Sequence, residues 1–167
     1  VSHFCGTIIC TPPQPRREEY AVVDGQQRLT TFALLHAKLS RKIDRETFLC
    51  PEGRTLFTPQ RGDANSFASL MLGDTPEKPE TLAQEKYLEA SAAIQQWIDD
   101  DTERAIRMLD HVESRLHFIF FVLHDDFEVA KVFETINNRG KPLSQIDLVK
   151  NHLIYLASIK NWELPDI

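Results

Sequence analysis

Cysteine is scarce in this chain, and the three cysteines, Cys5, Cys10 and Cys50, show no CxxC spacing. An odd number of cysteines without paired spacing argues against a disulfide framework and against a zinc ribbon. It favours reduced thiols and therefore predicts a cytoplasmic location. We expect Cys5 and Cys10, which lie on the first predicted strand, to be buried and unreactive.

Long apolar runs are lacking as well. The most apolar stretch, "LHFIFFVL" from Leu116 to Leu123, has the length of a strand and is too short to span a bilayer. The sequence has no secretory signal peptide. We therefore predict no contact with a membrane.

Positive charge is in deficit, because 19 Lys and Arg face 25 Asp and Glu and leave a net charge of −6. This balance argues against electrostatic binding of nucleic acid over the whole surface, although a local basic patch is compatible with it.

No GxxxxGK[ST], GxGxxG or GxSxG motif is present, which excludes a Walker A loop, a dinucleotide fingerprint and a nucleophile elbow. Adjacent His124, Asp125 and Asp126 point in different directions on an extended segment, so we predict helix capping there and no metal site.

What the sequence does contain is a set of short β-branched runs and amphipathic helices. Strands are predicted over Gly6–Cys10, over Tyr20–Val23, around Arg54–Asp63, and over Leu116–Leu123, where we expect a central strand buried on both faces. Helical spacing predicts helices from Gln26, over Ala64–Leu72, over Leu82–Ile98 with Trp97 inward, after Asp101, over Phe127–Asn138, and from Ser144 to about Ser158. His36 lies on the apolar stripe of the first helix, so we expect a hydrogen-bonded core histidine.

The first polar constellation is Asp24-Gly25-Gln26-Gln27-Arg28, at the join between a strand and a helix. A helix N-terminus attracts anions, phosphate above all, and glycine lets the backbone come close to a ligand. The glutamine amides both donate and accept, Arg28 offers a bidentate fork suited to phosphate, and Asp24 could hold a magnesium ion through water. The alternative is a tight turn with Asp24 as the N-cap and Arg28 on the surface.

The second constellation lies in "VFETINNRGKPLSQIDLVKN", from Val132 to Asn151. Its candidate residues are Asn137, Arg139, Gly140 and Asp147. Asp147 and Asn151 are one helical turn apart and share a face. The alternative is a well-capped corner between two helices.

Together, "VVDGQQRLTTFALL" and "VFETINNRGKPLSQIDLVKNHLI" resemble the N-terminal domain family of GmrSD-type, modification-dependent restriction enzymes. The intervening "GRTLFTPQRGDANSFASLML" also fits that family, so the resemblance covers nearly the whole chain. It implies an α/β (α+β), helix-rich fold, with a small mixed sheet of ParB/sulfiredoxin-like type and several added helices. We expect residues 1–167 to form a single domain of a longer chain, without the upstream segment and the C-terminal HNH nuclease domain.

The resemblance also implies a nucleotide-handling module that works beside an HNH nuclease in cis or in trans. The ligand would be GTP or ATP, with Mg²⁺, and DNA would be bound through the full-length enzyme; a homo-oligomer is compatible with this. The turn from Asp24 to Arg28 would hold the phosphates, Gln26 or Gln27 would position water or a phosphate oxygen, and Arg28 would stabilise charge on the phosphoryl group. The catalytic residues would be Asp24, Gln27 and Arg28. Asn137, Arg139, Gly140 and Asp147 would order the pocket.

These expectations lead to one hypothesis and one alternative. The hypothesis is a regulatory domain that binds and hydrolyses a nucleoside triphosphate within a DNA-targeting defence enzyme, and that does not cut DNA by itself. The alternative is a non-enzymatic DNA-sensing or protein-docking module, in which the turn from Asp24 to Arg28 serves only structure.

Overall fold

A computed structural model of the chain describes residues 2–13, 19–59, 62–74, 78–98 and 101–124. The chain divides into two compact units. The helical unit consists of Val1–Gly6 and Gly25–Phe118, and the strand unit consists of Thr7–Asp24 and Ile119–Ile167. The predicted helices over Phe127–Asn138 and from Ser144 lie outside the described residues.

Among the described residues, three strands form a small mixed sheet in the order β2-β1-β3. They are β1 (His3–Thr11), β2 (Ala21–Asp24) and β3 (Leu116–Val122). Strands β1 and β2 are antiparallel, and the register pairs Ile9 with Asp24 and Cys10 with Val22 across an irregularity in β1. β-Branched and apolar residues favour these runs, and the first two predicted strands are confirmed to within a few residues.

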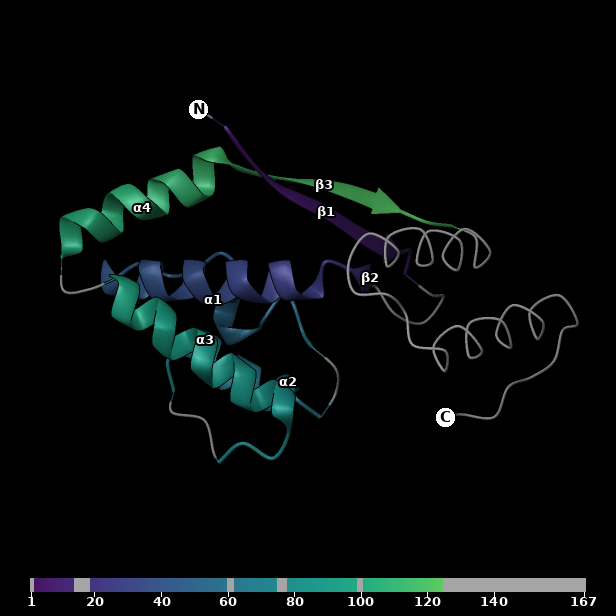
Figure 1. Ribbon diagram of the computed structural model, residues 1–167, viewed down its shortest axis with the longest axis horizontal. Coiled ribbons are helices and arrows are strands. Elements are labelled where there is room, and N and C mark those ends of the chain that lie inside the picture. Colours follow the sequence, from purple (N-terminus) through teal and green to yellow (C-terminus); the bar gives the residue numbers. More distant parts are fainter. Residues whose placement is uncertain (1, 14–18, 60–61, 75–77, 99–100, 125–167) are drawn as a thin grey trace, which may run out of the picture. The chain divides into compact units, whose positions relative to one another are not determined.

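The third strand departs from its prediction. β3 lies at the edge of the described sheet and not at its centre (Figure 1). Its side chains Ile119, Phe120 and Phe121 are 48%, 56% and 54% exposed. The continuous apolar run predicted burial on both faces, but an edge position leaves a strand with fewer neighbours to cover it.

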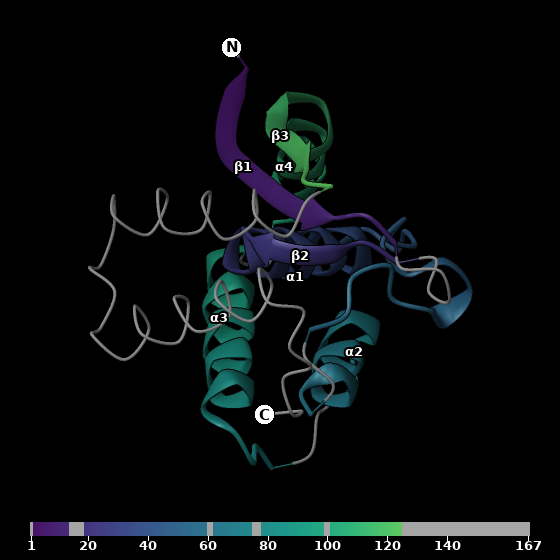
Figure 2. The same ribbon diagram turned by 90° about the vertical axis from the view of Figure 1, so that its right-hand side faces the viewer.

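Four α-helices are described in the helical unit. They are α1 (Gln26–Lys42), α2 (Ala64–Leu72), α3 (Leu82–Ile98) and α4 (Thr102–Arg115). Helix α1 packs against each of the other three, with α4 on one side and with α2 and α3 on the other (Figures 1 and 2). The resulting combination of a small sheet with helices is the α+β class predicted from the sequence.

Helix α1 occupies this position because it has apolar residues on both sides. One side contributes Ala33, Leu34 and Ala37 to a cluster with Phe67 and Met71 of α2. The other side contributes Leu39 to a second cluster with residues of α3 and α4 that include Ile98, Ala105 and Leu109. Burying large apolar side chains of this kind stabilises a fold by roughly 1.5–3 kcal/mol each.

Local signals set where the other helices begin and end. The carboxylate of Asp101 accepts a hydrogen bond from the backbone N–H of Arg104 at 3.0 Å and so caps the start of α4. Helix α2 ends at Gly73, whose φ of 91° is the left-handed conformation that glycine adopts readily. The Arg41 guanidinium donates to the Met71 carbonyl at 2.8 Å and so satisfies one of the last carbonyls of α2.

Two smaller predictions are wrong. No strand forms in the described residues around 54–63, where a 3₁₀ turn, η1 (Pro51–Gly53), is followed by irregular chain. The ring of Phe57 in this segment packs edge-on against that of Phe67, with 5.7 Å between the ring centroids. Its apolar side chain therefore packs in the helical core and not against a sheet. Trp97 is 51% exposed, not inward, and its ring lies 5.6 Å from the Arg104 guanidinium.

In the part of the chain that the structure describes, no helix combines the length and the apolar composition that a bilayer crossing needs. The three cysteines are free, with Cys10 and Cys50 buried and Cys5 partly buried. The ParB/sulfiredoxin-like type of the sheet stays a prediction.

Candidate functional site

The join between β2 and α1 turns on Gly25. Strand β2 ends at Asp24 and α1 begins at Gln26, so one residue separates the two elements. Gly25 has φ 93° and ψ 8°, a left-handed conformation that costs other residues energy. Its carbonyl accepts the first helical hydrogen bond, from the N–H of Leu29 at 3.0 Å. Gly25 is therefore the N-cap, and the alternative in which Asp24 takes that position is wrong.

The polar side chains that follow Gly25 lie at the surface. Gln26, Gln27 and Arg28 are exposed, whereas Gly25 itself is buried. No side chain of the N-cap residue reaches the first-turn amides of α1, since glycine has none. The first turn of a helix presents N–H groups that have no carbonyl partner within the helix. This arrangement has the chemistry of an anion site: amides, an arginine and two carboxamides beside a backbone without a side chain.

The structure divides the predicted site residues. Gly25, Gln26, Gln27 and Arg28 belong to the helical unit, and Asp24 belongs to the strand unit, where it pairs with Ile9. The residues of the second constellation lie outside the described residues. These are Asn137, Arg139, Gly140 and Asp147. Their predicted closure over the first motif therefore stays a prediction.

One residue beside this site was missed from the sequence. Gly6 lies in β1, within the helical unit, and has φ 109°. A Cβ atom at Gly6 would lie 3.1 Å from Arg28 Nε, so the arginine side chain passes over the glycine backbone. The available signal was a glycine inside a predicted strand, which often marks a close approach by another group.

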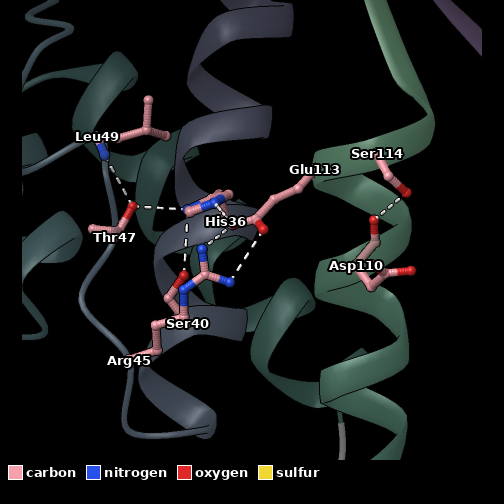
Figure 3. Close-up of polar contacts among 8 residues, drawn as sticks. All are labelled: His36, Ser40, Arg45, Thr47, Leu49, Asp110, Glu113 and Ser114. Carbon is pink, nitrogen blue, oxygen red and sulfur yellow. Dashed lines mark hydrogen bonds and ion pairs between the residues drawn. The ribbon is translucent and has the colours of Figure 1, made fainter.

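A second polar cluster surrounds His36, in the second half of α1 (Figure 3). The His36 ring is 0% exposed, and each of its nitrogens has a partner. Nδ1 lies 2.8 Å from Thr47 Oγ1 and 3.3 Å from Ser40 Oγ, and Nε2 lies 2.9 Å from Glu113 Oε1. The predicted hydrogen-bonded core histidine is confirmed.

The proton positions in this cluster follow from the donors present. With the proton on Nε2, His36 donates to the Glu113 carboxylate, and Nδ1 accepts from the Thr47 hydroxyl. Thr47 Oγ1 in turn accepts from the backbone N–H of Leu49 at 3.3 Å. Arg45 holds Glu113 with a fork, because NH2 lies 2.9 Å from Oε1 and NH1 lies 3.1 Å from Oε2.

Burial and charge act on this cluster in opposite directions. Burial lowers the pKa of His36, while the hydrogen bond from its ring to Glu113 raises it, and burial prevails. Burial raises the pKa of Glu113, but its hydrogen bonds with His36 and Arg45 together outweigh burial and lower it. At neutral pH the cluster therefore holds a neutral imidazole beside an ionised carboxylate that Arg45 neutralises.

A cavity of about 350 Å³ opens near the far end of α1. It lies by the C-terminal turn of α1, roughly 20 Å along the helix from Gly25 at a rise of 1.5 Å per residue. Its lining residues are Ala37, Arg41, Asp44, Arg45, Glu46, Thr47, Cys50, Gly53, Met71 and Leu72. Arg41 and Arg45 are engaged with Met71 and Glu113, and two acidic residues balance their charge, so the cavity is not a built anion site. Burial raises the pKa of Cys50 and keeps its thiol protonated.

No cluster of three or more His, Cys, Asp or Glu side chains that could hold a metal ion occurs among the described residues.

A comparison with protein families gives one match. The family of the GmrSD restriction endonuclease N-terminal domain matches residues 1–154. The chain belongs to this family. Membership in the GmrSD N-terminal domain family points to a restriction or defence enzyme. No curated protein matches the chain.

Proposed function

We propose that the chain is a nucleotide-binding regulatory domain of a DNA-targeting, modification-dependent restriction enzyme. The observation that carries the proposal is the turn at Gly25. A buried glycine with positive φ begins a long helix, and three exposed polar side chains, Gln26, Gln27 and Arg28, follow it directly. Membership of the GmrSD N-terminal domain family supports the proposal, because the turn sits within the matched residues.

The turn suits the phosphates of a nucleoside triphosphate, GTP or ATP. The first-turn amides of α1 would bind phosphate oxygens, and the positive end of the helix dipole would favour their charge. Arg28 would bind two oxygens with its fork and stabilise the charge that develops when the terminal phosphoryl group is transferred to water. Gln27 would orient that water or a phosphate oxygen through its carboxamide. Asp24 would hold the Mg²⁺ that accompanies the nucleotide, through water.

Asn137, Arg139, Gly140 and Asp147 would close the site from the second motif. In the full-length enzyme, nucleotide binding would govern an HNH nuclease, in cis or in trans, that acts on modified DNA. A homo-oligomer and a cytoplasmic location are compatible with this role.

The test is calorimetric titration of the chain with GTP, ATP and their deoxy forms in the presence of magnesium. We expect micromolar affinity, about −8 kcal/mol, for at least one triphosphate. Arg28→Ala should weaken that affinity at least tenfold, because a charge-assisted pair is worth roughly 1.5–3 kcal/mol. Arg104→Ala is a matched control, since Arg104 lies on α4 and contacts Trp97. Equal affinity in Arg28→Ala and wild type would remove Arg28 from the site.

The alternative, a docking module without nucleotide chemistry, is favoured by one observation. Edge strand β3 exposes three consecutive large apolar side chains, Ile119, Phe120 and Phe121. Exposed apolar patches on a protein often mark a surface that another protein covers. If no triphosphate binds, and if the separate HNH nuclease domain binds wild type but not Phe121→Ser, the docking role replaces the nucleotide role.

A further inference from the structure

Gly6 lies within strand β1 but has a backbone conformation that other strand residues do not adopt. Its φ of 109° lies outside the range that residues with a side chain adopt readily. Glycine weakens the interior of a strand, because it adds no side-chain packing and loses more conformational freedom on folding. Its presence therefore calls for a local reason, and the contacts of Gly6 supply one.

That reason is the side chain of Arg28, which belongs to the same helical unit. A Cβ atom at Gly6 would lie 3.1 Å from Nε, 3.3 Å from Cδ and 3.5 Å from Cζ of Arg28. These distances are at or below ordinary van der Waals contact between a methyl group and these atoms. A side chain at this position would therefore crowd the last part of the Arg28 side chain, which would have to shift by a few tenths of an ångström.

We propose that Gly6 is a positioning residue for Arg28, and this inference rests on the proposed nucleotide site. Arginine has many rotamers, and the loss of that freedom on binding reduces affinity. Because Gly6 has no side chain, the Arg28 side chain can lie against β1. Gly6 thereby fixes the direction from which the fork meets a phosphate, without touching the ligand itself.

Substitutions at two other glycines serve as controls that distinguish the positioning of Arg28 from simple backbone strain. Gly53 has φ 76°, and a Cβ placed there would meet no atom within 4 Å, so Gly53→Ala introduces strain without a clash. Gly73 has φ 91°, and a Cβ there would lie 2.5 Å from Arg41 Cζ, so Gly73→Ala introduces strain and a clash with a different arginine. Of these three substitutions, only Gly6→Ala combines strain with crowding of Arg28.

The experiment is a double-mutant cycle in triphosphate affinity, measured by calorimetry with magnesium on wild type, Gly6→Ala, Arg28→Ala and the double variant. We expect Gly6→Ala to weaken binding roughly tenfold, the scale of one hydrogen bond lost or misaligned. In the Arg28→Ala background the same substitution should change affinity less than about twofold. Gly53→Ala and Gly73→Ala should bind as wild type does. Unchanged affinity in Gly6→Ala, or an equal loss in both backgrounds, would overturn the inference.

A measurement without ligand separates this inference from the proposed function. The ¹H–¹⁵N resonance of Arg28 Nε, assigned by its disappearance in Arg28→Lys, should shift in Gly6→Ala and stay in place in Gly53→Ala. An unshifted resonance in Gly6→Ala would overturn the positioning role, whatever the calorimetry gives. A shifted resonance in a chain that binds no triphosphate would uphold the Gly6–Arg28 relation and refute the nucleotide as its ligand.

Discussion

The first turn of helix α1 and its second half hold polar side chains in opposite settings. Gln26, Gln27 and Arg28 lie at the surface beside a buried glycine. His36 is fully buried, and its two ring nitrogens are bonded to Thr47 and Glu113. A buried polar group needs a hydrogen-bond partner within the fold, so we interpret the His36 cluster as one that stabilises the protein. Exposed polar side chains after a left-handed glycine contribute little to a core, and the proposed function gives these three a role in binding a ligand.

The largest expected effect is the loss of stability in His36→Ala, which removes the buried member of this comparison. The substitution removes a buried ring, leaves a cavity beside Phe48 and deprives Glu113 and Thr47 of a partner. We expect the free energy of unfolding to fall by about 3 kcal/mol, measured by urea denaturation. Nucleotide affinity should be unchanged when both proteins are folded.

The matched control for this substitution is His111→Ala. His111 is exposed on α4, and its loss should change the free energy of unfolding by no more than about 0.5 kcal/mol. Equal stability of the two variants would show that the His36 cluster is not a stabilising one.

A smaller effect concerns pH, and its sign follows from burial. The pKa of folded His36 lies below the ordinary 6.5, so the unfolded chain takes up this proton first as pH falls. The pKa of folded Glu113 lies below the ordinary 4.5, so the unfolded chain again binds the proton more readily. Stability should therefore fall as pH is lowered from about 6.5 through the folded pKa of His36, and fall further below about 4.5.

The measurement is the melting temperature of wild type and His36→Gln across this pH range. A glutamine can donate to Glu113 and accept from Thr47 but does not titrate. The advantage of wild type over His36→Gln should therefore shrink between neutral pH and pH 5. A constant difference would show that His36 does not change its charge on unfolding in this window.

The smallest effect compares two helix starts. Helix α4 begins at Asp101, whose side chain caps it, whereas α1 begins at Gly25, which has no side chain to do so. Asp101→Ala should lower the free energy of unfolding by about 1 kcal/mol. Asp110→Ala, on the exposed face of the same helix, should be neutral. Identical unfolding curves for these two variants would mean that the Asp101 cap is worth nothing.

The sequence predicted those parts of the fold that depend on neighbouring residues. Helix α1 starts at Gln26 as expected, because Asp-Gly breaks the strand and the apolar period changes there. Helices α2 and α3 match their predicted bounds for the same reason, with Gly73 ending α2. The burial of His36 was likewise predictable, because the residue lies on the apolar stripe of α1.

What the sequence did not predict depends on residues far apart in the chain. Glu113 is 77 residues from His36, and no local pattern connects the two. Gly6 and Arg28 come together only when β1 and α1 are in place. The edge position of β3 follows from sheet order, which an apolar run does not specify. Local periodicity therefore located the candidate turn. Which residues contact its side chains depends on parts of the chain that are far apart in sequence.

The most direct test of the contrast along α1 is the shift in melting temperature that GTP or ATP with magnesium produces in wild type, Arg28→Ala and His36→Gln. A triphosphate at about 100 times its dissociation constant should add roughly 2.7 kcal/mol and raise the wild-type melting temperature by several degrees. Arg28→Ala should melt like wild type without nucleotide and lose the shift. His36→Gln should melt lower without nucleotide and keep the shift. Loss of the shift in both variants, or in neither, would contradict the separation of a ligand site from a stabilising cluster.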